Sequence, residues 1–168
     1  MAGWLAWRIE RQHDEPVDRG LAEAAGLLHD IDKALPPDER RGLPHGHAGA
    51  AWLDDHGYGE LAEAVRLHPV PRLADAAQAE AVRRASLEAR IVAYADKRAG
   101  QRLEPMSSRF AGWRKRYPEG WSREQQALAW QNALALEADV CARAGCPPRD
   151  VGRLRWTAQA FVGAGRPT

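Results

Sequence analysis

The stretch AAGLLHDIDKAL, residues 24–35, leads a run of small and apolar side chains directly into His29 and Asp30. Both side chains can bind metals, and both are costly to bury without a partner. The stretch therefore indicates one of two arrangements. Either a helix ends here and passes into solvent, or an imidazole and a carboxylate are held inside the fold for a chemical purpose.

The segments on both sides of this stretch are rich in helix formers. Ala, Leu, Glu, Arg and Gln dominate them, whereas period-two alternation and β-branched residues are scarce. A capping-box pattern, SREQ at 122–125, and Gly145 bound the last long helix. The sequence thus predicts an all-α fold. The expected helices cover about 2–13, 19–35, 46–56, 60–68, 78–100, a segment after Pro105, and 122–144.

Composition limits the classes of partner. The chain has 168 residues, 45% of them hydrophobic, and a formal net charge of +1, so a global charge gives no reason to expect a nucleic-acid polymer or an anionic membrane. No apolar run approaches the roughly 18 residues needed to span a bilayer, and the N-terminus lacks a signal-peptide pattern. We therefore expect a cytoplasmic protein. Cys141 and Cys146 are spaced unlike a zinc or redox pair, which leaves no cysteine for a metal site.

Three further motifs carry residues with metal-binding chemistry. His45 opens HGHAGAAW at 45–52, and His68 ends LAEAVRLH at 61–68. Asp96 lies in RIVAYADK at 90–97, whose apolar residues predict a largely buried helix, so its carboxylate needs a cationic partner or a metal. Imidazoles and carboxylates together suit one or two divalent ions, of manganese, iron, cobalt or nickel, with magnesium at oxygen-rich positions.

The motifs LLHDIDK, HGHAGA, AVRLH and IVAYADK, in this order, resemble the HD-domain superfamily of metal-dependent phosphohydrolases. The set is similar to the HDIG subgroup and to the bacterial HD hydrolases that cleave diadenosine tetraphosphate symmetrically. The resemblance implies a helical HD domain over residues 1–104. We expect residues 105–145 to form a helical extension packed on that domain and residues 146–168 to form a short tail.

The resemblance also implies roles for individual residues. Two metals are expected, with His29 and Asp30 as ligands and Asp30 bridging; His45 and His68 complete the set of ligands of the second metal, and Asp96 is the distal aspartate. His47 is an alternative to His45. Metal-bound hydroxide would attack phosphorus in line, so the predicted function is hydrolysis of a phosphate ester or anhydride of a nucleotide.

Lysine is rare in this chain and its placement is informative. Only Lys33, Lys97 and Lys115 are present, and the first two follow candidate ligand carboxylates. An ammonium group suits a phosphate oxygen, so we expect Lys33 to be catalytic by stabilising developing charge and also to bind substrate. Lys97, Arg66 and Arg102 are further candidates for binding a small phosphorylated molecule.

The sequence departs from the family pattern at its start. That pattern includes another histidine ligand on the first helix, and alignment places it slightly before Met1, whereas His13 falls at the far end of the helix. Either the start codon was assigned too late or the protein lacks this ligand. Trp4, Leu5 and Ile9 look like the intact remainder of a packing helix, which favours the first explanation.

A second departure is Asp32, where the HDIG pattern has glycine; this carboxylate either supports a metal ligand or faces solvent. Two other functions remain open at this stage. One is a catalytically impaired HD-fold ligand sensor or interaction module, and the other is a di-iron oxygenase. The oligomeric state is not predicted by the sequence.

Overall fold

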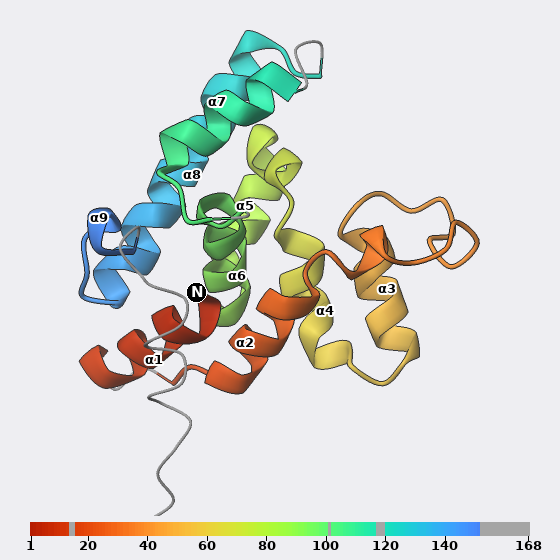
Figure 1. Ribbon diagram of the computed structural model, residues 1–168, viewed down its shortest axis with the longest axis horizontal. Coiled ribbons are helices and arrows are strands. Elements are labelled where there is room, and N and C mark those ends of the chain that lie inside the picture. The colour runs from red at the N-terminus through yellow and green to blue at the C-terminus, as the bar shows by residue number, and fades with distance from the viewer. Residues whose placement is uncertain (14–15, 101, 117–119, 152–168) are drawn as a thin grey trace, which may run out of the picture.

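The computed structural model describes residues 1–13, 16–100, 102–116 and 120–151, and these form an array of helices (Figure 1). The predicted all-α class is confirmed. The part of the expected 146–168 tail that follows Val151 lies outside the described residues. The elements in chain order are α1 (Ala2–His13), α2 (Arg19–Leu28), the 3₁₀ helix η1 (Ile31–Lys33), α3 (His47–Asp55), α4 (Gly59–Leu67), the 3₁₀ helix η2 (Val70–Ala74), α5 (Ala76–Arg84), α6 (Leu87–Arg98), α7 (Met106–Arg116), α8 (Arg123–Arg143) and α9 (Pro148–Val151).

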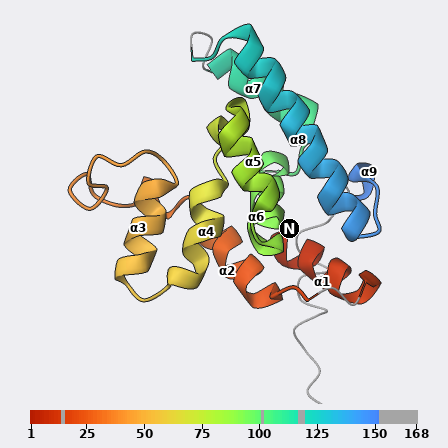
Figure 2. The same cartoon turned by 180° about the vertical axis from the view of Figure 1, so that it is seen from behind.

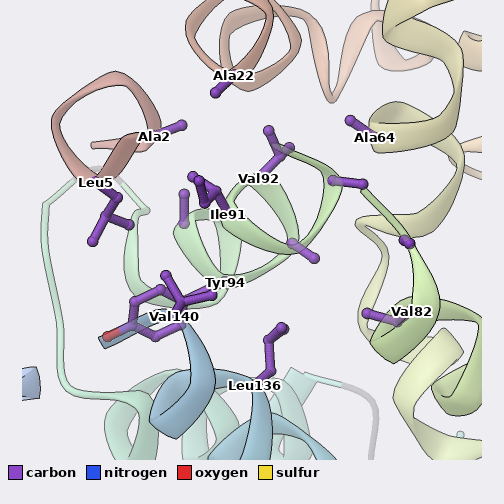
Figure 3. Packing of buried hydrophobic residues seen from close by; sticks show 14 of the residues in the cluster. Ala2, Leu5, Ala22, Ala64, Val82, Ile91, Val92, Tyr94, Leu136 and Val140 are labelled. Atoms are coloured by element: carbon purple, nitrogen blue, oxygen red, sulfur yellow. The ribbon is translucent and has the colours of Figure 1, made fainter. Parts of the chain in front are cut away.

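Helix α6 forms the centre of the core. Its Ile91, Val92 and Tyr94 are almost completely buried, and Figure 3 shows them surrounded by apolar side chains of α1, α2, α4 and α8. Burying one such side chain stabilises the fold by about 1.5–3 kcal/mol. Because α6 is enclosed on several sides, the polar residues near its C-terminal end are held in a fixed position relative to α2 and α4.

Two expected helices end earlier than the sequence patterns suggest. The helix expected over 19–35 ends at Leu28, after which the chain tightens into η1 and reaches Pro36 and Pro37, which cannot continue a helix. The helix expected over 78–100 is divided into α5 and α6. Ser86 causes this break, because its hydroxyl accepts a hydrogen bond from the Ala89 amide and caps a new helix.

The long helix α8 lies along one side of α6, opposite α3 and the segment that leads to it (Figures 1 and 2). The capping box predicted at its start is present, and Gly145 ends it at a φ of +57°. A buried ion pair joins the two helices: Arg98 of α6 lies 2.6 Å from Glu137 of α8, and the Tyr94 hydroxyl donates to the same carboxylate at 2.9 Å. None of the described helices has the length and apolarity needed to cross a membrane.

Candidate metal centre

The His29–Asp30 pair lies where α2 ends and η1 begins. His29 is the C-cap residue of α2, and its Nδ1 atom donates to the Gly26 carbonyl at 2.9 Å. Asp30 follows at the start of the tighter 3₁₀ turn. The pair is therefore partly enclosed at a helix end, and its side chains turn toward α3, α4 and α6 rather than away from the fold.

The Asp30 carboxylate is the centre of the cluster. Its Oδ1 atom lies 3.3 Å from His45 Nε2 and 3.6 Å from His68 Nε2, while its Oδ2 atom lies 3.5 Å from His29 Nε2. Lys33 Nζ donates to Oδ2 at 2.7 Å. Partial burial acts to raise the pKa of Asp30, but the contacts from His45, His68 and Lys33 outweigh it and hold that pKa well below its usual range. Asp30 is therefore ionised at any physiological pH.

Asp96 approaches the same centre from α6. Its Oδ1 atom lies 3.6 Å from His29 Nε2. Burial acts to raise the pKa of Asp96, but the contact with His29 and the charge of Lys97 lower it overall. The five predicted ligands thus come together from four separate segments of the chain. These segments are the α2–η1 junction, the start of α3, the end of α4, and α6.

All three imidazoles turn Nδ1 away from the centre and Nε2 toward it. Nδ1 of His29 and of His68 faces a backbone carbonyl, at 2.9 Å from Gly26 and 2.6 Å from Val65. A carbonyl only accepts, so each Nδ1 must carry the hydrogen, and the Nε2 lone pair is left for a cation. His45 differs, because its Nδ1 atom faces the carboxylate of Asp32.

The Nε2 atoms of His45 and His68 lie only 3.2 Å apart. Two facing lone pairs repel each other unless a proton or a metal ion lies near both. His68 is 1% exposed, and burial lowers its pKa, which disfavours a proton on this ring. The donors present, three imidazole nitrogens with two ionised carboxylates, fit a first-row divalent ion.

Within the described part of the chain, two groups of side chains are close enough to hold an ion, with ligand atoms within 4.8 Å of one another. One consists of His29, Asp30 and His68, and the other of Asp30, Asp32 and His45. Asp30 belongs to both groups, which is the placement expected of a bridging carboxylate.

The model of the HD domain family matches residues 1–100 of the chain. This chain belongs to the HD domain family. HD domains are in general metal-dependent phosphohydrolases that bind divalent ions, and the clustered histidines and aspartates all lie in the matched region. Searches of the curated proteins and of the solved structures gave no match.

Of the two candidate histidines near the start of α3, His45 and not His47 contacts the carboxylates of Asp30 and Asp32. Gly46, next to it, has a φ of +82°, and a Cβ there would lie 2.7 Å from Pro69 Cγ and 3.0 Å from the Val65 carbonyl. Only glycine permits this close approach between the start of α3 and the end of α4, which brings His45 to His68. His47 instead lies near positive charge: burial, then Arg72 and Arg66, lower its pKa.

The expected phosphate-binding cations are placed differently from one another. Lys33 is 62% exposed at the edge of the cluster. Lys97 is 0% exposed, and its ammonium donates to the carbonyls of His68 and Ala93 at 2.7 and 2.9 Å, which does not fit the expected contact with substrate. The Lys97 side chain instead links the backbone of His68 to α6. Burial lowers the pKa of Lys97 to about 8, although the Asp96 carboxylate opposes the shift.

The two arginines singled out in the sequence lie on the surface. Arg66 is exposed near the end of α4, and Arg102 is exposed with its Nε atom 3.3 Å from Glu104. Arg109 of α7 belongs to a run of cations at 109–116 that the sequence offers either as a contact for a polyphosphate or as a solvated helix face, and its Nη2 atom donates to the Asp96 carbonyl at 3.2 Å. The sequence does not indicate this contact, because it depends on how α7 packs at the end of α6.

Proposed function

We propose that this HD domain is a metal-dependent phosphohydrolase that cleaves a phosphate ester or anhydride of a nucleotide. The observation that carries the proposal is the convergence of three imidazole Nε2 atoms on Asp30, with Asp96 beside them. His29, Asp30, His45, His68 and Asp96 would hold a divalent ion, which would activate water as a nucleophile near neutral pH and offset charge on the phosphoryl oxygens.

The chain's own residues supply the remaining requirements. The three histidines present fixed Nε2 atoms because each Nδ1 is already hydrogen-bonded. Asp30 is ionised and central, which suits a bridging ligand. The Lys33 ammonium lies at the exposed edge of the cluster, 2.7 Å from Asp30 Oδ2, where it can contact a phosphoryl oxygen as negative charge develops.

The proposed substrate is a small phosphorylated molecule rather than a nucleic-acid polymer. A net charge of +1 gives no global reason to expect a polyanion, whereas an exposed ammonium beside a metal centre suits a single phosphate group. Arg66 and Arg102 are proposed to contact more distant phosphate oxygens. The motif set resembles the HDIG subgroup and the HD hydrolases of diadenosine tetraphosphate, and this resemblance supports testing nucleotides with phosphoanhydride bonds first.

The test is a measurement of metal content and phosphate release. The purified chain is loaded with manganese, iron(II), cobalt, nickel or magnesium and offered a panel of nucleoside mono-, di- and triphosphates and dinucleoside polyphosphates. We expect one or two ions per chain and hydrolysis of at least one substrate. Asp30→Ala should abolish both while circular dichroism shows unchanged helix content, and Asp38→Ala, a change in an exposed residue, should abolish neither.

Two results would contradict the proposal. A wild-type chain that binds no metal under any of these conditions would favour a ligand sensor or interaction module. Turnover that depends on molecular oxygen would favour a di-iron oxygenase.

A further inference from the structure

Asp32 is a buried carboxylate beside the metal centre, at a position where the related sequence pattern has glycine. Its side chain is 5% exposed. Its Oδ1 and Oδ2 atoms lie 3.0 and 2.9 Å from His45 Nδ1, and Oδ2 also accepts the Gly46 amide at 2.8 Å. A buried charge of this kind is tolerated only when donors satisfy it, and here both donors come from the segment that carries His45.

His45 depends on this carboxylate more than the other two histidines depend on their partners. His29 and His68 are the C-cap residues of α2 and α4, and backbone carbonyls of those helices hold their rings. His45 instead ends an exposed segment that begins at Pro36, and no helix carbonyl contacts its ring among the described residues. Among the residues that the structure describes, Asp32 is therefore the only one that anchors the Nδ1 side of the ring.

A carboxylate acceptor has two effects on an imidazole ligand. It keeps the hydrogen on Nδ1, so that the Nε2 lone pair faces Asp30 Oδ1, 3.3 Å away. It also makes that lone pair more basic than a neutral carbonyl would, which strengthens a bond to a cation.

We propose that Asp32 is a positioning residue that fixes His45 in the orientation and tautomer required of a metal ligand, without binding the ion itself. The inference rests on the proposed metal centre and not on the choice of substrate. Asp32 lies close enough to Asp30 and His45 to be a ligand on distance alone, but both of its oxygens already accept hydrogen bonds from His45 and Gly46. Direct ligation by Asp32 is the competing outcome that the experiment must separate.

The test uses Asp32→Asn and Asp32→Ala in the full chain, with Asp38→Asn as a control on the exposed segment that follows η1. Affinity and stoichiometry for Mn²⁺ are measured by calorimetry. The tautomer of the His45 ring is measured in the metal-free protein by long-range ¹H–¹⁵N correlation spectra. Neither readout requires turnover.

We expect Asp32→Ala to weaken Mn²⁺ binding roughly 10- to 100-fold without changing the number of ions bound. The Nδ1–H tautomer of His45 should give way to a mixture in the same variant. Asp32→Asn keeps an acceptor oxygen but loses the charge, so its affinity should lie between wild type and Asp32→Ala. The control should match wild type in both measurements.

Two results would overturn the inference. Loss of one ion from the stoichiometry, with the tautomer unchanged, would make Asp32 a ligand. Lower thermal stability with unchanged affinity and tautomer would leave it a purely structural residue. If the wild-type chain binds no Mn²⁺, the proposed function fails, and the tautomer in Asp32→Ala still decides whether Asp32 positions the ring.

Discussion

Replacing Lys33 with methionine should change metal binding and turnover in opposite directions. The Lys33 ammonium lies 2.7 Å from Asp30 Oδ2, so it competes with a bound cation for that carboxylate and repels it. The two side chains are 62% and 37% exposed, and an exposed ion pair of this kind is worth at most about 1 kcal/mol. Lys33→Met should therefore strengthen the affinity for Mn²⁺ by no more than about fivefold.

Turnover should fall despite the tighter metal. Removing one charged group that stabilises a developing negative charge costs about 10²- to 10³-fold in kcat. The assay measures the Kd for Mn²⁺ by calorimetry, and kcat and KM by phosphate release at saturating metal, using the best substrate of the nucleotide panel. Lys115→Met, on the exposed surface of α7, is the matched control and should change neither quantity.

Two outcomes would refute this reasoning. If metal affinity falls together with kcat, Lys33 organises the centre rather than acting on the substrate. If kcat is unchanged, the ammonium is not catalytic and its contact with Asp30 is an ordinary surface ion pair.

Three other predictions follow from the structure. Burial acts to lower the pKa of His29 and of His45, but contacts with Asp30, Asp32 and Asp96 raise both values above 6.5. The stability that these rings add to the metal-free protein should therefore be complete below pH 6.5 and lost as pH rises through the raised values, while Mn²⁺ affinity increases over the same window. Thermal melts of the wild type, His29→Gln and His45→Gln measure the stability, and calorimetry measures the affinity. Gly46→Ala should cost roughly 3 kcal/mol or more and weaken metal binding, whereas Gly57→Ala, at a φ of +81° with nothing within 4 Å, should cost only about 1 kcal/mol, as urea unfolding can test. Glu137→Gln should destabilise the protein by about 3 kcal/mol in the same assay, because it leaves a buried guanidinium of α6 without its carboxylate; a cost below about 1 kcal/mol would contradict this account.

The local sequence was sufficient for the fold class and for most helix ends. Helix formers, the capping box at Ser122 and the glycine at 145 act over a few residues, so their effects can be predicted without knowing the rest of the chain. The two misjudged helices have the same explanation. Apolar periodicity continues through Leu35 and across Ser86, but a tighter 3₁₀ turn in one case and a hydroxyl cap in the other ended the helix.

The candidate site was predictable as a set of residues but not as a geometry. The order of the four motifs named His29, Asp30, His45, His68 and Asp96. The structure places the three histidines around the Asp30 carboxylate and Asp96 beside His29. The spacing of these motifs along the sequence does not predict which ring nitrogen of each histidine faces Asp30. That choice depends on the acceptor behind each ring, which only the packed backbone supplies.

The roles of the other charged residues were decided by tertiary structure alone. The sequence left Asp32 either supporting a ligand or facing solvent, and it made Lys97 a candidate for binding a phosphorylated substrate. Burial settles both placements: Asp32 accepts from His45 and Gly46, and Lys97 donates to two carbonyls inside the fold. A sequence specifies which charges exist and on which helix face they lie, whereas the dielectric around each charge and the partner it meets depend on segments that are distant along the chain.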